Sequence, residues 1–151
     1  MNEEIIQIVM AFFGSLGFAV LFNVKKGHIV YAALNGLLSC IVYLLAFSYL
    51  ENVFISSMIS SVFAAIYGEI LARIRKAPAT QFTIIGLIPL VPGASLYYTM
   101  IYSVSQNWTK VKYFGQLTVE YALGIAIGIS VVWAFANMIR GVGVKKGNIS
   151  G

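Results

Sequence analysis

Charge is scarce in this sequence. The 151 residues include ten Lys and Arg and five acidic residues, so charged residues make up only 10% of the chain. A soluble domain carries about 25% charged residues, because a chain of this length needs a large polar surface. Hydrophobic residues make up 60%, and the mean hydropathy is +0.87. These values exclude a soluble enzyme, a nucleic-acid-binding domain and a disordered chain, and they predict that the lipid bilayer surrounds the protein.

Cysteine is nearly absent as well. The single cysteine, Cys40, cannot form a disulfide within the chain, and no Cys/His spacing is typical of a metal site. The sequence shows no pairing of a nucleophile with a base and no phosphate-binding loop. We therefore expect no enzymatic activity, no catalytic residues, no cofactor and no metal. The net charge of +5 comes from short basic clusters typical of membrane proteins, so we expect no nucleic-acid partner.

Long apolar stretches are what the sequence has in abundance. About 20 helical residues cross a hydrocarbon core of about 30 Å. Five such stretches cover residues 5–24, 29–50, 53–72, 82–104 and 117–139. Two glutamates precede the first stretch, where a signal peptide would carry basic residues, so we expect this span to be retained. We predict an all-α integral membrane protein with a single domain, residues 1–151, and five transmembrane helices.

The basic residues predict the orientation. Two of the ten, Lys110 and Lys112, lie between the last two stretches. The other eight lie in the first loop, the third loop and the C-terminal tail: Lys25, Lys26, Arg73, Arg75, Lys76, Arg140, Lys145 and Lys146. The positive-inside rule then places the N-terminus outside and the C-terminus inside. Most tyrosines, with Tyr43 and Tyr121 among them, are interpreted as an aromatic belt near the membrane surfaces.

Small residues recur at every fourth position, a pattern that lets helix backbones approach closely in lipid. Shorter rows contain Gly36 and Cys40, or Gly124 and Gly128. The longest rows lie in residues 53–72: Ser56, Ser60, Ala64, Gly68 and Ala72, beside Ser57, Ser61 and Ala65. Packing within the chain and contact with another membrane subunit both remain open. The stretch 53–72 is the first choice for a surface that faces such a subunit.

The stretch 82–104 is predicted to be broken at its Pro-Leu-Val-Pro-Gly motif. Each proline lacks a backbone donor and clashes with the carbonyl four residues earlier. A second half-helix starting near Gly93 would leave N–H groups unpaired, and that end suits a small solute that carries a carboxylate. A plain proline kink without a ligand is the alternative. The candidate solute-binding residues are Pro89, Pro92, Gly93, Ala94, Ser95, Tyr97, Tyr98 and Thr99.

Two carboxylates are candidates for further roles. Glu120 lies four residues into the stretch 117–139, and a carboxylate inside a membrane is costly and often functional, so it is the first candidate for proton coupling. An interfacial position for Glu120 is the alternative. Glu69 and Arg73 have the i, i+4 spacing of a helical ion pair, for which we expect a structural role.

One stretch of the sequence resembles a known family. The pattern Pro78-Ala79-Thr80-x-Phe82, then Gly86-x-x-Pro89-Leu90-Val91-Pro92-Gly93-x-x-x-Tyr97-Tyr98-Thr99-Met100, is similar to the threonine/serine exporter family, and more narrowly to the small five-span membrane subunit of its split form. The resemblance covers roughly residues 10–140.

This resemblance implies half of a proton-coupled secondary transporter in a bacterial-type cytoplasmic membrane. It would export threonine and serine, or dicarboxylates such as succinate, together with a larger five-span partner subunit. A scaffold or regulatory subunit and a homo-oligomeric channel are the alternatives.

Overall fold

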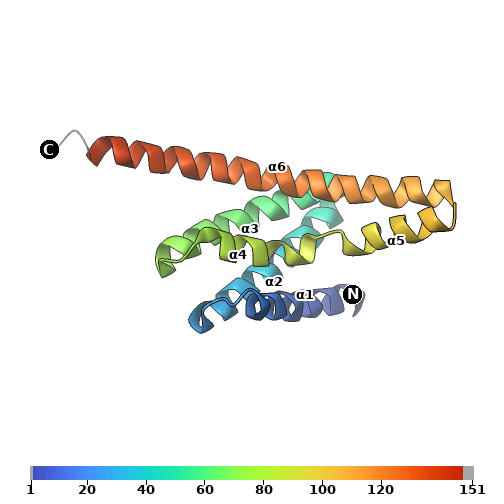
Figure 1. Cartoon of the computed structure of the whole chain (residues 1–151), viewed down its shortest axis with the longest axis horizontal. Helices are drawn as coiled ribbons and strands as arrows, with labels where there is room; N and C mark the ends of the chain where they lie inside the picture. Colours follow the sequence, from blue (N-terminus) through green and yellow to red (C-terminus); the bar gives the residue numbers. More distant parts are fainter. Residues whose placement is uncertain (1, 148–151) are drawn as a thin grey trace.

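The chain folds into a bundle of helices (Figure 1). The computed structural model describes the backbone of residues 2–147 and the side chains of residues 3–139. The elements in chain order are α1 (Asn2–Leu21), α2 (Lys26–Leu50), α3 (Val53–Arg75), α4 (Ala79–Leu87), the 3₁₀ turn η1 (Ile88–Leu90), α5 (Gly93–Val104) and α6 (Trp108–Gly147). Residues 2–147 contain no strand, so the all-α prediction is confirmed. The side chains of Arg140, Lys145 and Lys146 lie outside the described part.

The helices α1, α2, α3 and α6 are each long and apolar enough to cross a membrane. The segments Ala79–Leu90 and Gly93–Val104 pass the same test together, but they are bent by 52° at the break between them. Such a pair is either one broken span or a re-entrant loop. The structure therefore supports four spans, or five if the bent pair crosses the membrane as one.

The helix α3 starts at the predicted residue 53, whereas the other helices start before the predicted spans, most of all α6. This helix begins at Trp108 and not near Leu117, so Lys110 and Lys112 lie in its first two turns and not in a loop. The Oδ1 atom of Asn107 accepts a hydrogen bond from the Lys110 N–H at 3.3 Å, and Asn52 caps α3 in the same way. An asparagine at this position satisfies one of the free donors of the first turn and favours a helix start there.

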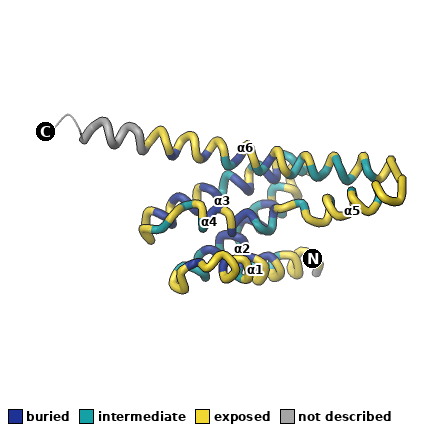
Figure 2. Tube along the Cα trace, in the orientation of Figure 1, coloured by how far each residue is buried: buried dark blue, intermediate teal, exposed yellow. Residues whose placement is uncertain are grey.

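The helix α3 lies at the centre of the bundle and packs against α2, α4 and α6. Its buried residues include every member of the two predicted small-residue rows, and Figure 2 shows the buried positions along this helix in dark blue. The two rows therefore pack within this chain. This finding removes α3 as the first choice for a surface that faces another subunit.

A buried amide joins three of the helices. Asn35 on α2 is fully buried, and its Nδ2 atom donates to the carbonyl oxygens of Ala64 on α3 at 3.1 Å and Phe82 on α4 at 2.9 Å. Gly86 lies so close to this side chain that a Cβ atom there would collide with it. The low dielectric of the interior strengthens such hydrogen bonds, and they fix the register of α4 against its neighbours.

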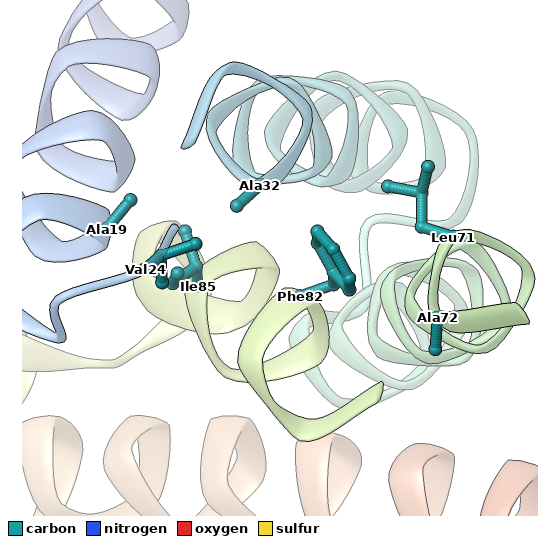
Figure 3. Packing of buried hydrophobic residues seen from close by; sticks show 7 residues of the cluster. All are labelled: Ala19, Val24, Ala32, Leu71, Ala72, Phe82 and Ile85. Carbon is teal, nitrogen blue, oxygen red and sulfur yellow. The ribbon is translucent and has the colours of Figure 1, made fainter. Parts of the chain in front are cut away.

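An apolar cluster also packs α4 against its neighbouring helices. Phe82 lies between α2 and α3, and Ile85 lies toward α1 (Figure 3). The His28 ring stacks on Phe82, with 5.7 Å between the ring centroids. The remaining members of the cluster are small or branched side chains that fill the space around these two residues: Ala19, Val24, Ala32, Leu71 and Ala72.

Glycines set the distance between α6 and α3. A Cβ atom added at Gly124 would lie 2.6 Å from the Phe54 carbonyl oxygen, and one added at Gly128 would lie 2.8 Å from the Met58 carbonyl oxygen. Both neighbours are backbone atoms of α3, which cannot rotate away as a side chain could. The two helices therefore pack at a separation that only glycine permits at these positions.

We predict that Gly124→Ala destabilises the protein. The added methyl group forces α6 away from α3, which costs about 1–3 kcal/mol for an overpacked site. Thermal unfolding in a mild detergent measures the effect as a lower melting temperature. Gly115→Ala is the matched control, because it lies on the same helix and its Cβ atom would meet its nearest neighbour at an ordinary 3.8 Å. Equal melting temperatures for the two variants would contradict the predicted close contact.

Candidate functional site: a cavity at the broken helix

The break begins at Pro89, which has no N–H to donate to the carbonyl oxygen of Ile85. That oxygen accepts instead from the backbone N–H of Ile88, and from the hydroxyl of Ser15 on α1 at 3.4 Å. The chain tightens here into the 3₁₀ turn η1. Pro89 thus leaves the Ile85 carbonyl oxygen without its usual helical donor. The Ser15 hydroxyl of α1 supplies a hydrogen bond to this oxygen instead.

Pro92 shapes the second part of the break. The residue before a proline is disfavoured in the helical region, and Val91 is extended at φ −61° and ψ 126°. Pro92 itself has φ −76° and ψ 52°, and the Gly93 N–H donates to the Val91 carbonyl oxygen at 2.7 Å. This is the geometry of an inverse γ-turn. The helix α5 starts directly after it.

A cavity of about 240 Å³ lies against this turn. Its wall contains five of the eight predicted solute-binding residues, and none of its described lining residues carries a formal charge. The lining residues are Gln7, Cys40, Tyr43, Pro89, Leu90, Val91, Pro92, Gly93, Ala94, Ser95 and Tyr121. A second cavity of similar size on the α1 side shares Gln7, Cys40 and Pro89 with the first.

The start of α5 has unpaired backbone donors in residues that line this cavity. The Leu96 N–H donates to the Pro92 carbonyl oxygen at 3.0 Å. Within the described part of the chain, no atom accepts a hydrogen bond from the backbone N–H of Ala94 or Ser95. Unpaired N–H groups and the helix dipole make such an end locally positive. The wall can therefore hold a carboxylate although it contains no basic side chain.

The other three predicted residues lie outside this wall. Tyr97 is 59% exposed, and Tyr98 packs its ring against Phe114 on α6, with 5.1 Å between the ring centroids. The hydroxyl of Thr99 donates to the Ser95 carbonyl oxygen at 2.7 Å. The structure thus brings Pro89, Pro92, Gly93, Ala94 and Ser95 together in one wall, whereas Tyr98 joins α5 to α6 and Thr99 bonds within α5.

Six of the lining residues were not predicted as site residues from the sequence: Gln7, Cys40, Tyr43, Leu90, Val91 and Tyr121. Tyr43 is 8% exposed, so it lies inside the bundle and not in a lipid-facing belt, and its hydroxyl hydrogen-bonds to that of Tyr121. The spacing of these residues in the sequence does indicate the position of both tyrosines. Cys40 and Tyr43 continue the helix face of Gly36, and Tyr121 lies on the face of Gly124 and Gly128, so both tyrosines extend small-residue rows.

Most of the chain matches the model of a known protein family. The model of the family described as "Threonine/Serine exporter, ThrE" matches residues 7–135, which include every residue of the cavity wall. The chain belongs to this family. It is therefore a member of a family of membrane transporters and not of enzymes, and the resemblance noted in the sequence is confirmed. No solved structure matches the chain.

The two candidate carboxylates of this exporter-family chain have different surroundings. Glu120 on α6 is half-buried, accepts a hydrogen bond from Nε2 of Gln116 at 2.8 Å, and is not part of the cavity wall at the break. Glu69 on α3 is 9% exposed and lines two further cavities, of about 270 and 340 Å³. Arg73 lines the smaller of these with Glu69, and their ion pair stays a prediction.

Proposed function

We propose that this chain is half of a secondary transporter that exports threonine and serine, or dicarboxylates such as succinate, across the cytoplasmic membrane. The observation that carries the proposal is the cavity at the break, where two backbone N–H groups without an acceptor in the described chain meet a wall without formal charge. Membership in the threonine/serine exporter family supports threonine and serine as solutes. The proposed orientation has the N-terminus outside and the C-terminus inside, following the basic residues.

The cavity suits a transporter, which must bind its solute and then release it. Half-helix N-termini at a helix break are a recurring way for transporters to bind an anionic group near the middle of the membrane. A carboxylate bound by backbone N–H groups is held without a lysine or arginine. Backbone donors hold the anion through partial charges, so binding stays moderate and the solute can leave on the far side.

We expect Ser95→Ala to weaken solute binding. The variant removes a hydroxyl from the cavity wall, and a lost hydrogen bond of about 1 kcal/mol raises KM for threonine about fivefold.

Pro92→Ala should lower the maximal rate, because alanine permits the helical backbone that proline prevents here. Threonine uptake into inside-out membrane vesicles measures both. Ser130→Ala is the matched control, because this serine is exposed on α6 and its hydroxyl donates to the Ala126 carbonyl oxygen of the same helix. Unchanged uptake in both Pro92→Ala and Ser95→Ala would overturn the site assignment.

Glu120 is proposed to couple export to protons. Glu120→Gln then makes uptake into inside-out vesicles independent of an imposed pH gradient, whereas the wild type responds to it. Glu69→Gln is the comparison variant, because its burial and its two cavities make Glu69 the second candidate. Loss of the pH response in Glu69→Gln alone would transfer the coupling role to Glu69. A normal response in both variants would exclude proton coupling through these carboxylates.

A larger five-span partner subunit is proposed to cover the break. Val91 is 58% exposed and Gly93 is exposed, so irregular backbone reaches the surface of this chain. Irregular backbone inside a membrane must face protein or a water-filled cavity and not lipid. The helix α5 has 12 residues, of which none is buried, and it is too short to span the bilayer alone. We place the partner against α5 and the exposed face of α1.

We predict that the tagged chain is recovered with this partner when it is purified from its native membrane in a gentle detergent. The mass of the intact complex measures the composition. Recovery as a homo-oligomer alone would contradict the half-transporter and favour a channel, which would pass solute without a gradient. Recovery with a partner, combined with normal uptake by the Pro92 and Ser95 variants, would favour a scaffold subunit.

A further inference from the structure

Two tyrosine hydroxyls meet across the cavity. Tyr43 on α2 is 8% exposed, and its hydroxyl forms a hydrogen bond with that of Tyr121 on α6. The ring centroids are 5.7 Å apart and the ring planes are tilted by 34°. Both side chains line the cavity that also contains the start of α5. The pair is therefore a polar element of the wall that comes from two helices other than the broken one.

The helices α2 and α6 have few close backbone contacts with each other, because α3 packs against both. In Figure 1, α3 likewise runs between α6 and α2. Side chains of both helices nevertheless meet in one apolar cluster, where Tyr121 and Ile125 of α6 pack with Tyr43 of α2. The two hydroxyls are therefore polar groups within a largely apolar contact, and both side chains reach the cavity wall.

The chemistry of the pair complements that of the α5 start. A phenol hydroxyl has one proton to donate and two lone pairs. When two such groups bond to each other, one proton and several lone pairs remain available to a third group. The α5 start offers unpaired N–H donors and the Ser95 hydroxyl, so it suits a carboxylate. A solute that spans both elements has a carboxylate at one end and a group that both donates and accepts hydrogen bonds at the other.

We propose that the Tyr43–Tyr121 pair binds the side-chain hydroxyl of the solute and so selects hydroxy amino acids over dicarboxylates. The inference rests on the proposed transport function and names the residues that determine its specificity. A second carboxylate finds neither a basic side chain nor a second helix start in the described wall of this cavity. A hydroxyl finds both a donor and acceptors in the pair.

The test compares two solutes that differ by one hydroxyl, L-threonine and L-2-aminobutyrate. Their uptake is measured in inside-out vesicles from native cells in which each variant replaces the wild-type chain, with the partner present. Tyr43→Phe and Tyr121→Phe each remove one oxygen and keep the ring. A site built to bind a hydroxyl discriminates against the analogue that lacks it. We expect each variant to raise KM for threonine about five- to tenfold and to leave KM for 2-aminobutyrate unchanged.

Tyr49→Phe on α2 and Tyr113→Phe on α6 are the matched controls, because they make the same change at side chains that are 86% and 62% exposed. Equal changes in KM for the two solutes, or no change for either, would overturn the specificity role. Wild-type uptake of succinate without threonine would overturn it as well. Absence of uptake of all three solutes by the wild type would instead contradict the proposed transport function.

Discussion

The hydrogen bonds from the Asn35 carboxamide to α3 and α4 are the interaction on which the rest of the structure depends. Lipid removes most of the hydrophobic gain from helix association, so close packing and hydrogen bonds must hold a bundle together. Asn35 contributes both, because its amide bonds to two backbones while Gly86 packs against it. A change in the register of α4 would break these bonds. The amide therefore fixes where along the bundle the two prolines lie.

The cavity follows from that register. Pro89 and Pro92 stop the helix wherever α4 places them, and the turn around Pro92 exposes the start of α5. The wall is thus made mostly of backbone, neutral polar groups and small side chains. The proposed binding site needs no charged side chain, which is consistent with a chain that is only 10% charged. In this proposal, backbone donors at the helix break take the place of basic residues that the bilayer would penalise.

Most of the helical architecture could be predicted from the sequence, because long apolar runs leave few alternatives in lipid. The start of α6 could not, because Lys110 and Lys112 interrupt the apolar pattern although lysine is a good helix former. The helix instead begins at the Asn107 cap, before the apolar pattern starts. The small-residue rows indicated close approach but not the neighbour. The Tyr43–Tyr121 pair joins residues 78 positions apart, and no local pattern specifies which distant face a side chain meets.

The length of α6 has a mechanical consequence. This helix has 40 residues, which at 1.5 Å per residue extend about 60 Å, well beyond a hydrocarbon core of about 30 Å. The helix must therefore tilt strongly or project from the bilayer. Its glycine contacts with α3 lie near the middle of the helix, where the two backbones pack closely. The two ends of α6 therefore extend to either side of this contact, and a tilt of α6 about it would displace the two ends in opposite directions.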